Sequence, residues 1–188
     1  MNEERQTYTV EVAGLKRELP LFEVAPGVRI AIVNILGDNE LVQAAATELA
    51  LKLADKNPEV LLTAETKSIP LVYALSTKMD LPYVVLRKAY KPYMGNAIQA
   101  ETLSITTGTP QTLFLDEKDQ KLLVGRQVAL LDDVISTGST LQAMRLIADK
   151  VMAHVVAQAA IFTEGDRAKW SDVIALGHLP VFVQSDGI

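Results

Sequence analysis

The stretch VALLDDVISTGST, residues 128–140, joins a buried-strand pattern to two adjacent carboxylates and a run of small polar residues. Its apolar beginning, Val128 to Leu131, is typical of a central strand in a parallel sheet. Asp132 and Asp133 follow at the C-terminal end of that strand, where ligands sit in open α/β sheets. The segment therefore predicts a twisted parallel sheet flanked by helices, with a ligand site at its carboxyl edge.

The small residues after the acidic pair open a helix. They are Ser136, Thr137, Gly138, Ser139 and Thr140. Gly138 lets the backbone bend close to a ligand, and successive N–H groups, hydroxyls and the helix N-terminus favour an anion. A 5-phosphorylated ribose would offer its phosphate to this turn and its two hydroxyls to the aspartates. A simple helix cap with two solvated acids is the alternative, but it leaves the acids directly behind a buried strand unexplained.

This turn differs from two other phosphate-binding patterns. The sequence contains no G-x-x-x-x-G-K-[ST], which a P-loop requires, and Gly138 stands alone rather than in a G-x-G-x-x-G fingerprint.

The remaining chain alternates between helix and strand patterns, which favours a parallel sheet. We expect, in order, a helix from Asp38 or Asn39 to Asn57, a strand Val60 to Ala64, a helix Pro70 to Met79, a strand Tyr83 to Leu86, the helix after Gly138 and a strand Val155 to Phe162. Two stretches stand outside this alternation. The first contains a turn at Pro26-Gly27 and a strand Val28 to Leu36, and the second, Ala100 to Glu117, reads as an inserted β-hairpin around Gly108.

The bulk composition is that of a folded globular chain. It has 188 residues, 49% hydrophobic and 22% charged, with a net charge of −5 and no cysteine. The absence of cysteine excludes disulfides, thiolate zinc sites and cysteine nucleophiles. The negative charge argues against nucleic-acid and membrane partners. No signal-type segment or bilayer-spanning apolar run occurs, so a soluble, cytoplasmic protein is expected.

The run from Val128 to Thr140 resembles the signature of the type I phosphoribosyltransferases, which bind phosphoribosyl pyrophosphate. The resemblance implies that Asp132 and Asp133 are the catalytic residues, which hold the ribose hydroxyls, and that Ser136 to Thr140 hold the 5-phosphate. It also implies Mg²⁺, held through substrate and water without a direct protein cage, with the two aspartates as candidate contacts.

Two further stretches suit the diphosphate of the same ligand. Thr66, Lys67 and Ser68 follow the strand Val60 to Thr63, where the family places its pyrophosphate loop. Arg87, Lys88 and Lys91 put three cations within five residues, and RKAYK resembles the R-K-x-x-K of adenine and xanthine phosphoribosyltransferases, which contacts pyrophosphate partly across a dimer interface. The alternatives are a helix cap at Ser68 and a solvated charge run.

The base-binding residues are expected to be Arg29, Ile30 and Glu164. Glu164 could accept from a purine N–H, although a polar turn from Glu164 to Asp166 is the slightly favoured interpretation. Arg29 could pair with an acidic or keto-rich base. The adenine enzymes carry an aromatic after their Pro-Gly turn and a glutamate in their hairpin, whereas this chain has Val28 and Thr106-Thr107. His154, His178 and Trp170 are interpreted as structural.

These expectations describe one phosphoribosyltransferase-like domain over residues 1–188. It would have an N-terminal hood over 1–37, an α/β core over 38–188 and a flexible hairpin at about 90–117. The expected function is transfer of phosphoribose to a nucleobase, most simply a purine in salvage, by a homodimer. The alternatives are a binding protein that senses phosphoribosyl pyrophosphate without catalysis, and a transferase for another acceptor such as orotate.

Overall fold

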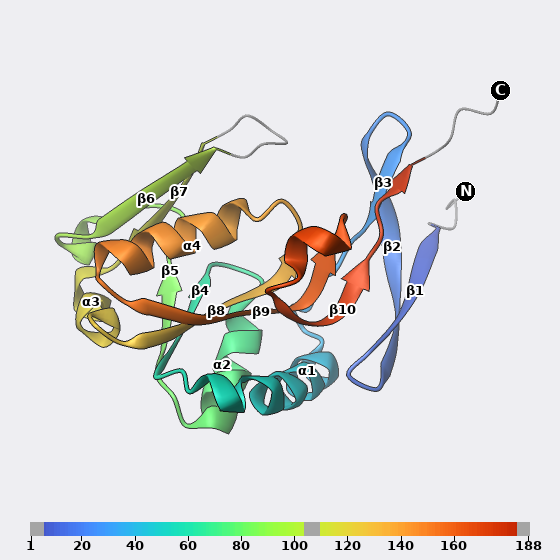
Figure 1. The fold of residues 1–188 in the computed structure, drawn as a ribbon. Helices are drawn as coiled ribbons and strands as arrows, with labels where there is room; N and C mark the ends of the chain where they lie inside the picture. The colour runs from blue at the N-terminus through green and yellow to red at the C-terminus, as the bar shows by residue number, and fades with distance from the viewer. Residues whose placement is uncertain (1–5, 104–109, 184–188) are drawn as a thin grey trace.

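A computed structural model describes residues 6–103 and 110–183 of the chain. Its central sheet is parallel, in the order β10-β9-β8-β4-β5. The strands are β4 (Val60–Ala64), β5 (Tyr83–Leu86), β8 (Gln127–Ile135), β9 (His154–Glu164) and β10 (Ile174–Leu179). Helix α4 (Ser139–Lys150) covers one face, and α1 (Asn39–Leu53) and α2 (Ile69–Met79) cover the other (Figure 1). The predicted parallel sheet flanked by helices is confirmed.

Strands β8 and β9 are longer than the apolar stretches from which they were predicted, mainly at their carboxyl ends. Pairing between them continues to Ile135 opposite Thr163, so backbone hydrogen bonding rather than hydrophobicity sets their ends. Asp132 and Asp133 therefore lie within the last part of β8 and not behind it. Glu164 is the last residue of β9, so the polar-turn interpretation of Glu164 was wrong.

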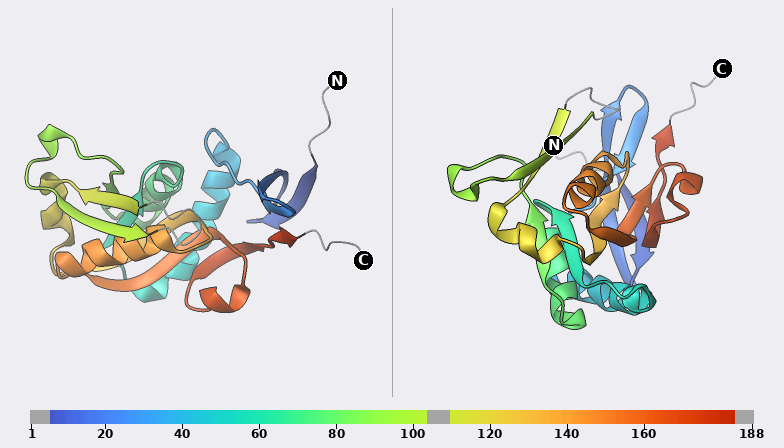
Figure 2. Two further views of the ribbon diagram at one scale, coloured as in Figure 1. Left: turned by 90° about the horizontal axis from the view of Figure 1, so that it is seen from above. Right: turned by 60° about the vertical axis from the view of Figure 1, so that its left-hand side comes forward.

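A second, antiparallel sheet forms a hood beside the main sheet. It contains β1 (Thr7–Val12), β2 (Leu15–Ala25), β3 (Val28–Ala31) and β11 (Phe182–Val183), in the order β1-β2-β3-β11. The strand predicted over Val28 to Leu36 ends at Ala31. Strand β11, which the sequence did not predict, pairs with β3, so residues from both ends of the described chain build the hood (Figure 2).

The predicted hairpin consists of β6 (Ile98–Leu103) and β7 (Pro110–Leu115), while its turn at Gly108 lies outside the described residues. Its strands pack against α4, where the Thr102 hydroxyl donates to the Ser139 carbonyl over 3.2 Å. Leu113 and Leu115 are fully buried. The base of the hairpin is thus part of the core. A short helix α3 (Glu117–Leu123) and the 3-10 helices η1 (Ala54–Lys56), η2 (Pro92–Met94) and η3 (Arg167–Trp170) complete the fold.

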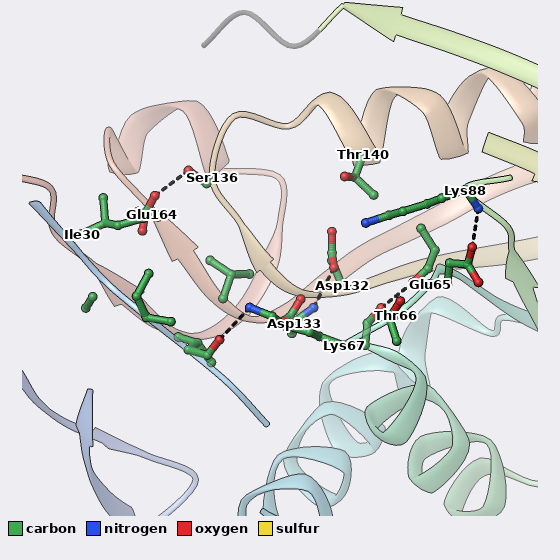
Figure 3. A pocket seen from close by; sticks show the side chains of 16 residues that line it. Ile30, Glu65, Thr66, Lys67, Lys88, Asp132, Asp133, Ser136, Thr140 and Glu164 are labelled. Atoms are coloured by element: carbon green, nitrogen blue, oxygen red, sulfur yellow. Dashed lines mark hydrogen bonds between the residues drawn. The ribbon is translucent and has the colours of Figure 1, made fainter. Parts of the chain in front are cut away.

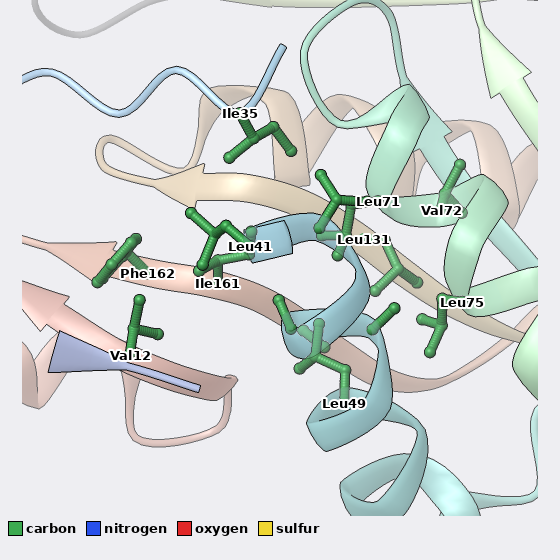
Figure 4. Close-up of a cluster of buried hydrophobic side chains, with 14 of the residues drawn as sticks. Val12, Ile35, Leu41, Leu49, Leu71, Val72, Leu75, Leu131, Ile161 and Phe162 are labelled. Carbon is green, nitrogen blue, oxygen red and sulfur yellow. The ribbon is translucent and has the colours of Figure 1, made fainter. Parts of the chain in front are cut away.

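Buried side chains fix the hood to the sheet. In Figure 4, Phe162 of β9 and Leu41 of α1 lie near Val12 of the hood, and the same apolar cluster extends to Leu71 of α2. The carboxyl ends of β4, β8 and β9 are therefore held at a defined position facing β3. Within the described part of the chain, no helix is long and apolar enough to cross a membrane.

Candidate functional site

A cavity of about 480 Å³ opens at the carboxyl ends of β4, β8 and β9 and is closed on one side by the hood (Figure 3). This is the edge at which ligands bind in open parallel sheets. Its lining consists of Ile30 to Val33, Ala64 to Ser68, Lys88, Asp132 to Val134, Ser136, Thr140 and Glu164. The structure thus brings together residues from five separate segments of the sequence.

The acidic pair occupies the middle of this cavity. Asp132 Oδ1 accepts from the Asp133 amide over 2.9 Å. Burial raises the pKa of Asp132 well above its ordinary value, and the neighbouring Asp133 charge raises it further, whereas Lys88 opposes this shift. In Figure 3 the Lys88 side chain extends toward Asp132. A carboxyl group in this position gains from hydroxyl donors or a cation, because either would stabilise its ionised form.

The turn into α4 forms a smaller adjoining cavity of about 130 Å³, lined by Asp132 and by Val134 to Leu141. Gly138 has φ of +80°, a left-handed conformation that favours glycine, and it directly precedes the first helical residue, Ser139. The first amides of a helix have no partner within it, so they are available to an anion. All five predicted phosphate-loop residues line this cavity.

The predicted diphosphate residues Thr66, Lys67, Ser68 and Lys88 also line the main cavity. The Lys67 ammonium donates to the Val33 carbonyl over 3.1 Å, so it spans the cavity between β4 and the hood. The Ser68 hydroxyl is buried and donates to the Ala64 carbonyl over 2.8 Å. Only the backbone of Ser68 can therefore face a ligand.

Arg87 and Lys91 do not line the cavity. The Arg87 guanidinium is held by Glu65, with Nε 2.7 Å from Oε2, while the Lys88 amide donates to Oε1 over 2.6 Å. Burial raises the pKa of Glu65, but these two hydrogen bonds outweigh it and hold that pKa below its ordinary value. Lys91 is the N-cap residue of η2 and is not among the residues that line the cavity. Of the three predicted cations, the structure brings only Lys88 to the cavity.

Ile30 and Glu164 lie at the hood end of the cavity. Glu164 is buried, and its Oε1 accepts from the Ser136 hydroxyl over 2.5 Å. Arg29 is not among the residues that line the cavity. Its guanidinium donates instead to the side chain of Gln6.

Phe22 is a candidate base contact that the sequence analysis missed. It pairs with Ile30 across β2 and β3, so both side chains lie on one face of the hood. The Phe22 ring is 62% exposed. The adenine enzymes carry their aromatic residue after the Pro-Gly turn, whereas Phe22 lies four residues before Pro26, on β2. Finding it from the sequence would have required the register in which β2 pairs with β3.

The donor set suits a magnesium ion that shares its ligands with a substrate. Asp132 and Asp133 present hard oxygen atoms, which Mg²⁺ prefers. No group of three or more His, Cys, Asp or Glu residues that could cage a metal occurs within residues 6–103 and 110–183. The protein could thus supply one or two ligands, while phosphate, hydroxyl and water oxygens would supply the rest.

A parallel sheet with an acidic pair and a phosphate-type turn at its carboxyl edge defines the type I phosphoribosyltransferase fold. Residues 33–177 match the family model described as the phosphoribosyl transferase domain. The chain belongs to this family.

Curated relatives include both enzymes and regulators. An adenine phosphoribosyltransferase of Rhodospirillum rubrum is 30% identical over 146 residues, covering 77% of this chain and 82% of the relative. The purine biosynthesis transcriptional repressor PurR of Bacillus subtilis is 28% identical over 132 residues, covering 70% of this chain and 46% of the relative. The chain thus spans about half the length of the PurR relatives.

Solved structures share the fold at low sequence identity. An adenine phosphoribosyltransferase of Trypanosoma brucei, in complex with AMP, pyrophosphate and ribose-5-phosphate, has a TM-score of 0.65 and 20% identity, covering 92% of this chain and 76% of that one. The enzyme of Thermoanaerobacter pseudethanolicus has a TM-score of 0.64 and 17% identity, covering 92% and 95%.

Proposed function

We propose that this protein binds phosphoribosyl pyrophosphate and transfers its phosphoribosyl group to a purine base, releasing pyrophosphate. The observation that carries the proposal is the continuity of two cavities through Asp132, Val134, Ser136 and Thr140. A sugar phosphate with its phosphate at the α4 turn can therefore place its hydroxyls at the acidic pair.

The charges of the site are arranged for an oxocarbenium-like transition state. Positive charge would develop on the sugar, next to Asp132 and Asp133, and negative charge on the diphosphate, next to Lys67 and Lys88. Positioning and electrostatic stabilisation of this kind can each lower a barrier by several kcal/mol. Mg²⁺ bound with the diphosphate would neutralise leaving-group charge.

Glu164 and Ile30 give the base end its chemistry. Glu164 Oε1 accepts one hydrogen bond, from Ser136. A carboxylate can accept several hydrogen bonds, so others remain available for a ring N–H of a purine. Ile30 and Phe22 would offer apolar and aromatic surface to the ring face.

The test is pyrophosphate release with Mg²⁺ and phosphoribosyl pyrophosphate across adenine, hypoxanthine, guanine, xanthine and orotate. Release with one or more purines supports the proposal. Release with orotate alone would show that the acceptor is a pyrimidine and not a purine. No heat on calorimetric titration with phosphoribosyl pyrophosphate would overturn the proposal altogether.

A sensor of phosphoribosyl pyrophosphate without catalysis is a second candidate. It is favoured by the similarity to proteins named as purine biosynthesis regulators, of which two are called activators and one a repressor. Thr106-Thr107, which stand where the family carries its hairpin glutamate, lie outside the described residues. Tight calorimetric binding with no pyrophosphate release on any base would support the sensor.

A cytoplasmic homodimer is part of the same proposal. Its support is the RKAYK segment, residues 87–91, where Tyr90 and Lys91 are exposed close in sequence to Lys88, and the exposed Tyr93 that follows it. Sedimentation equilibrium would show a dimer, and Lys91→Ala would weaken diphosphate binding if the residue acts across the interface. A monomer at micromolar concentration would remove this part of the proposal.

A further inference from the structure

We propose that Trp170 is a positioning residue of the phosphate loop, holding Gly138 in place and tying the loop to the end of β9. The proposal rests on the proposed function, because it assigns Trp170 a role in binding the same sugar phosphate. The sequence analysis treated this residue as structural, since no spacing links it to the motif.

The Trp170 ring lies directly against the loop. A Cβ atom built on Gly138 would be 2.8 Å from Cη2 and 3.3 Å from Cζ3 of the indole. The φ of +80° at Gly138 is a separate reason for glycine at this position. The indole therefore occupies the space into which a side chain at Gly138 would project, and the loop backbone cannot move toward it.

The other edge of the indole is fixed to β9. Its Nε1 donates to the Glu164 carbonyl over 2.9 Å. The side chain of the same glutamate accepts from Ser136. Glu164 therefore holds the loop at two points, directly at Ser136 and through the indole at Gly138.

The turn that carries Trp170 is itself anchored. Asp166 Oδ1 accepts from the Ala168 amide over 3.0 Å at the start of η3, and the Gly165 amide donates to the Leu179 carbonyl over 3.1 Å. The ring of His178 lies 2.9 Å from the Thr163 hydroxyl and 3.0 Å from the Gly165 carbonyl. Trp170 thus rests on a braced turn, and its ring can act as a rigid support.

This support would lower the entropy lost when the loop orders around a phosphate, which is how preorganisation improves affinity. Its effect should fall on sugar-phosphate binding and not on the base or the chemical step. Because the chain has a single tryptophan, its fluorescence also reports on this loop alone.

The experiment compares Trp170→Ala and Trp170→Phe with the wild type. The dissociation constant for Mg²⁺–phosphoribosyl pyrophosphate and for ribose 5-phosphate is measured by calorimetry, with KM for each substrate and kcat where turnover occurs. The matched control is Tyr73→Ala on α2, an exposed aromatic on the opposite face of the sheet. Circular dichroism confirms folding of each variant.

Trp170→Ala should weaken binding of both phosphates about tenfold, because a hydrogen bond and a packed ring are lost together. KM for the base and kcat should change less than about twofold, and Trp170→Phe should lose less affinity than Trp170→Ala. Ribose 5-phosphate should change the wild-type fluorescence. If Trp170→Ala does not fold, the affinity of Trp170→Phe and the fluorescence change of the wild type test the inference instead.

Wild-type affinity in both Trp170 variants, or an equal loss in Tyr73→Ala, would overturn the inference while leaving the proposed function intact. A fall in kcat or base affinity as large as the loss of phosphate binding would also overturn it. Absence of binding to the wild type would instead overturn the proposed function, and this inference with it.

Discussion

The charge state of Asp132 depends on the fold. Its carboxyl group lies in the cavity wall, where burial and Asp133 both raise its pKa. A sugar hydroxyl or a magnesium ion would favour the ionised form of this carboxyl group, which burial disfavours. Ligand binding should therefore release a proton from Asp132 at a pH near the raised pKa of its carboxyl group.

Asp132→Asn should stabilise the ligand-free protein at alkaline pH. Because the folded-state pKa of Asp132 is raised, its stabilising contribution is present below the ordinary pKa and is lost as pH rises through the raised value. The Tm of the variant should exceed that of the wild type at pH 8, and the difference should shrink at acidic pH. Thermal melts across this range measure it. Parallel curves for the two proteins would contradict the assignment.

Asp133→Asn should reduce transfer at least about tenfold, because one charge-assisted hydrogen bond contributes about 1.5–3 kcal/mol. The measurement is kcat/KM for phosphoribosyl pyrophosphate. Asp149→Asn on exposed α4 surface is the matched control and should retain wild-type turnover. Unchanged turnover in Asp133→Asn would remove this residue from the mechanism.

At the scale of elements, the sequence predicted strands best where the apolar run and the backbone pairing end at the same residue. This is the case for β4 and β5, whose pairing does not continue past their apolar residues. Glu164 was misplaced because pairing with β10 carries β9 beyond its apolar residues. Arg87 has the right charge for a diphosphate, but no spacing rule reveals that Glu65, 22 residues away, holds it.

The hood should contribute to base binding through Phe22. Phe22→Ala should raise KM for the base at least about fivefold, because an aromatic stack on a base contributes about 1–3 kcal/mol. KM for phosphoribosyl pyrophosphate should stay within about twofold. Leu51→Ala, on the exposed side of α1, is the control. An unchanged base KM would show that Phe22 faces solvent in the complex.

For the whole molecule, the acidic pair and the phosphate turn could be predicted because they are contiguous in the sequence. The cavity could not, because it needs β3, β4 and β9 together. The pairing of β11 with β3 in the hood could not be predicted either, because nearly the whole α/β core lies between these two strands in the sequence. Trp170 was missed for the same reason, since its contact with Gly138 exists only in three dimensions.

Binding at this cavity should stabilise the entire fold, since it joins hood, sheet and α4. At a ligand concentration about 100 times Kd, the gain is about 2.7 kcal/mol, or roughly 5–10 °C for a domain of this size. Thermal melts with Mg²⁺–phosphoribosyl pyrophosphate measure the shift. Magnesium alone and ligand with a chelator are the controls. No shift with the complete ligand would contradict binding at this site.

The pairing of β11 with β3 has a consequence for biosynthesis. While the ribosome has not yet released Phe182 and Val183, β3 presents a row of unpaired amides and carbonyls. Such an edge invites pairing with other chains, so a protein shortened before Phe182 should aggregate during expression even though residues 128–140 are intact.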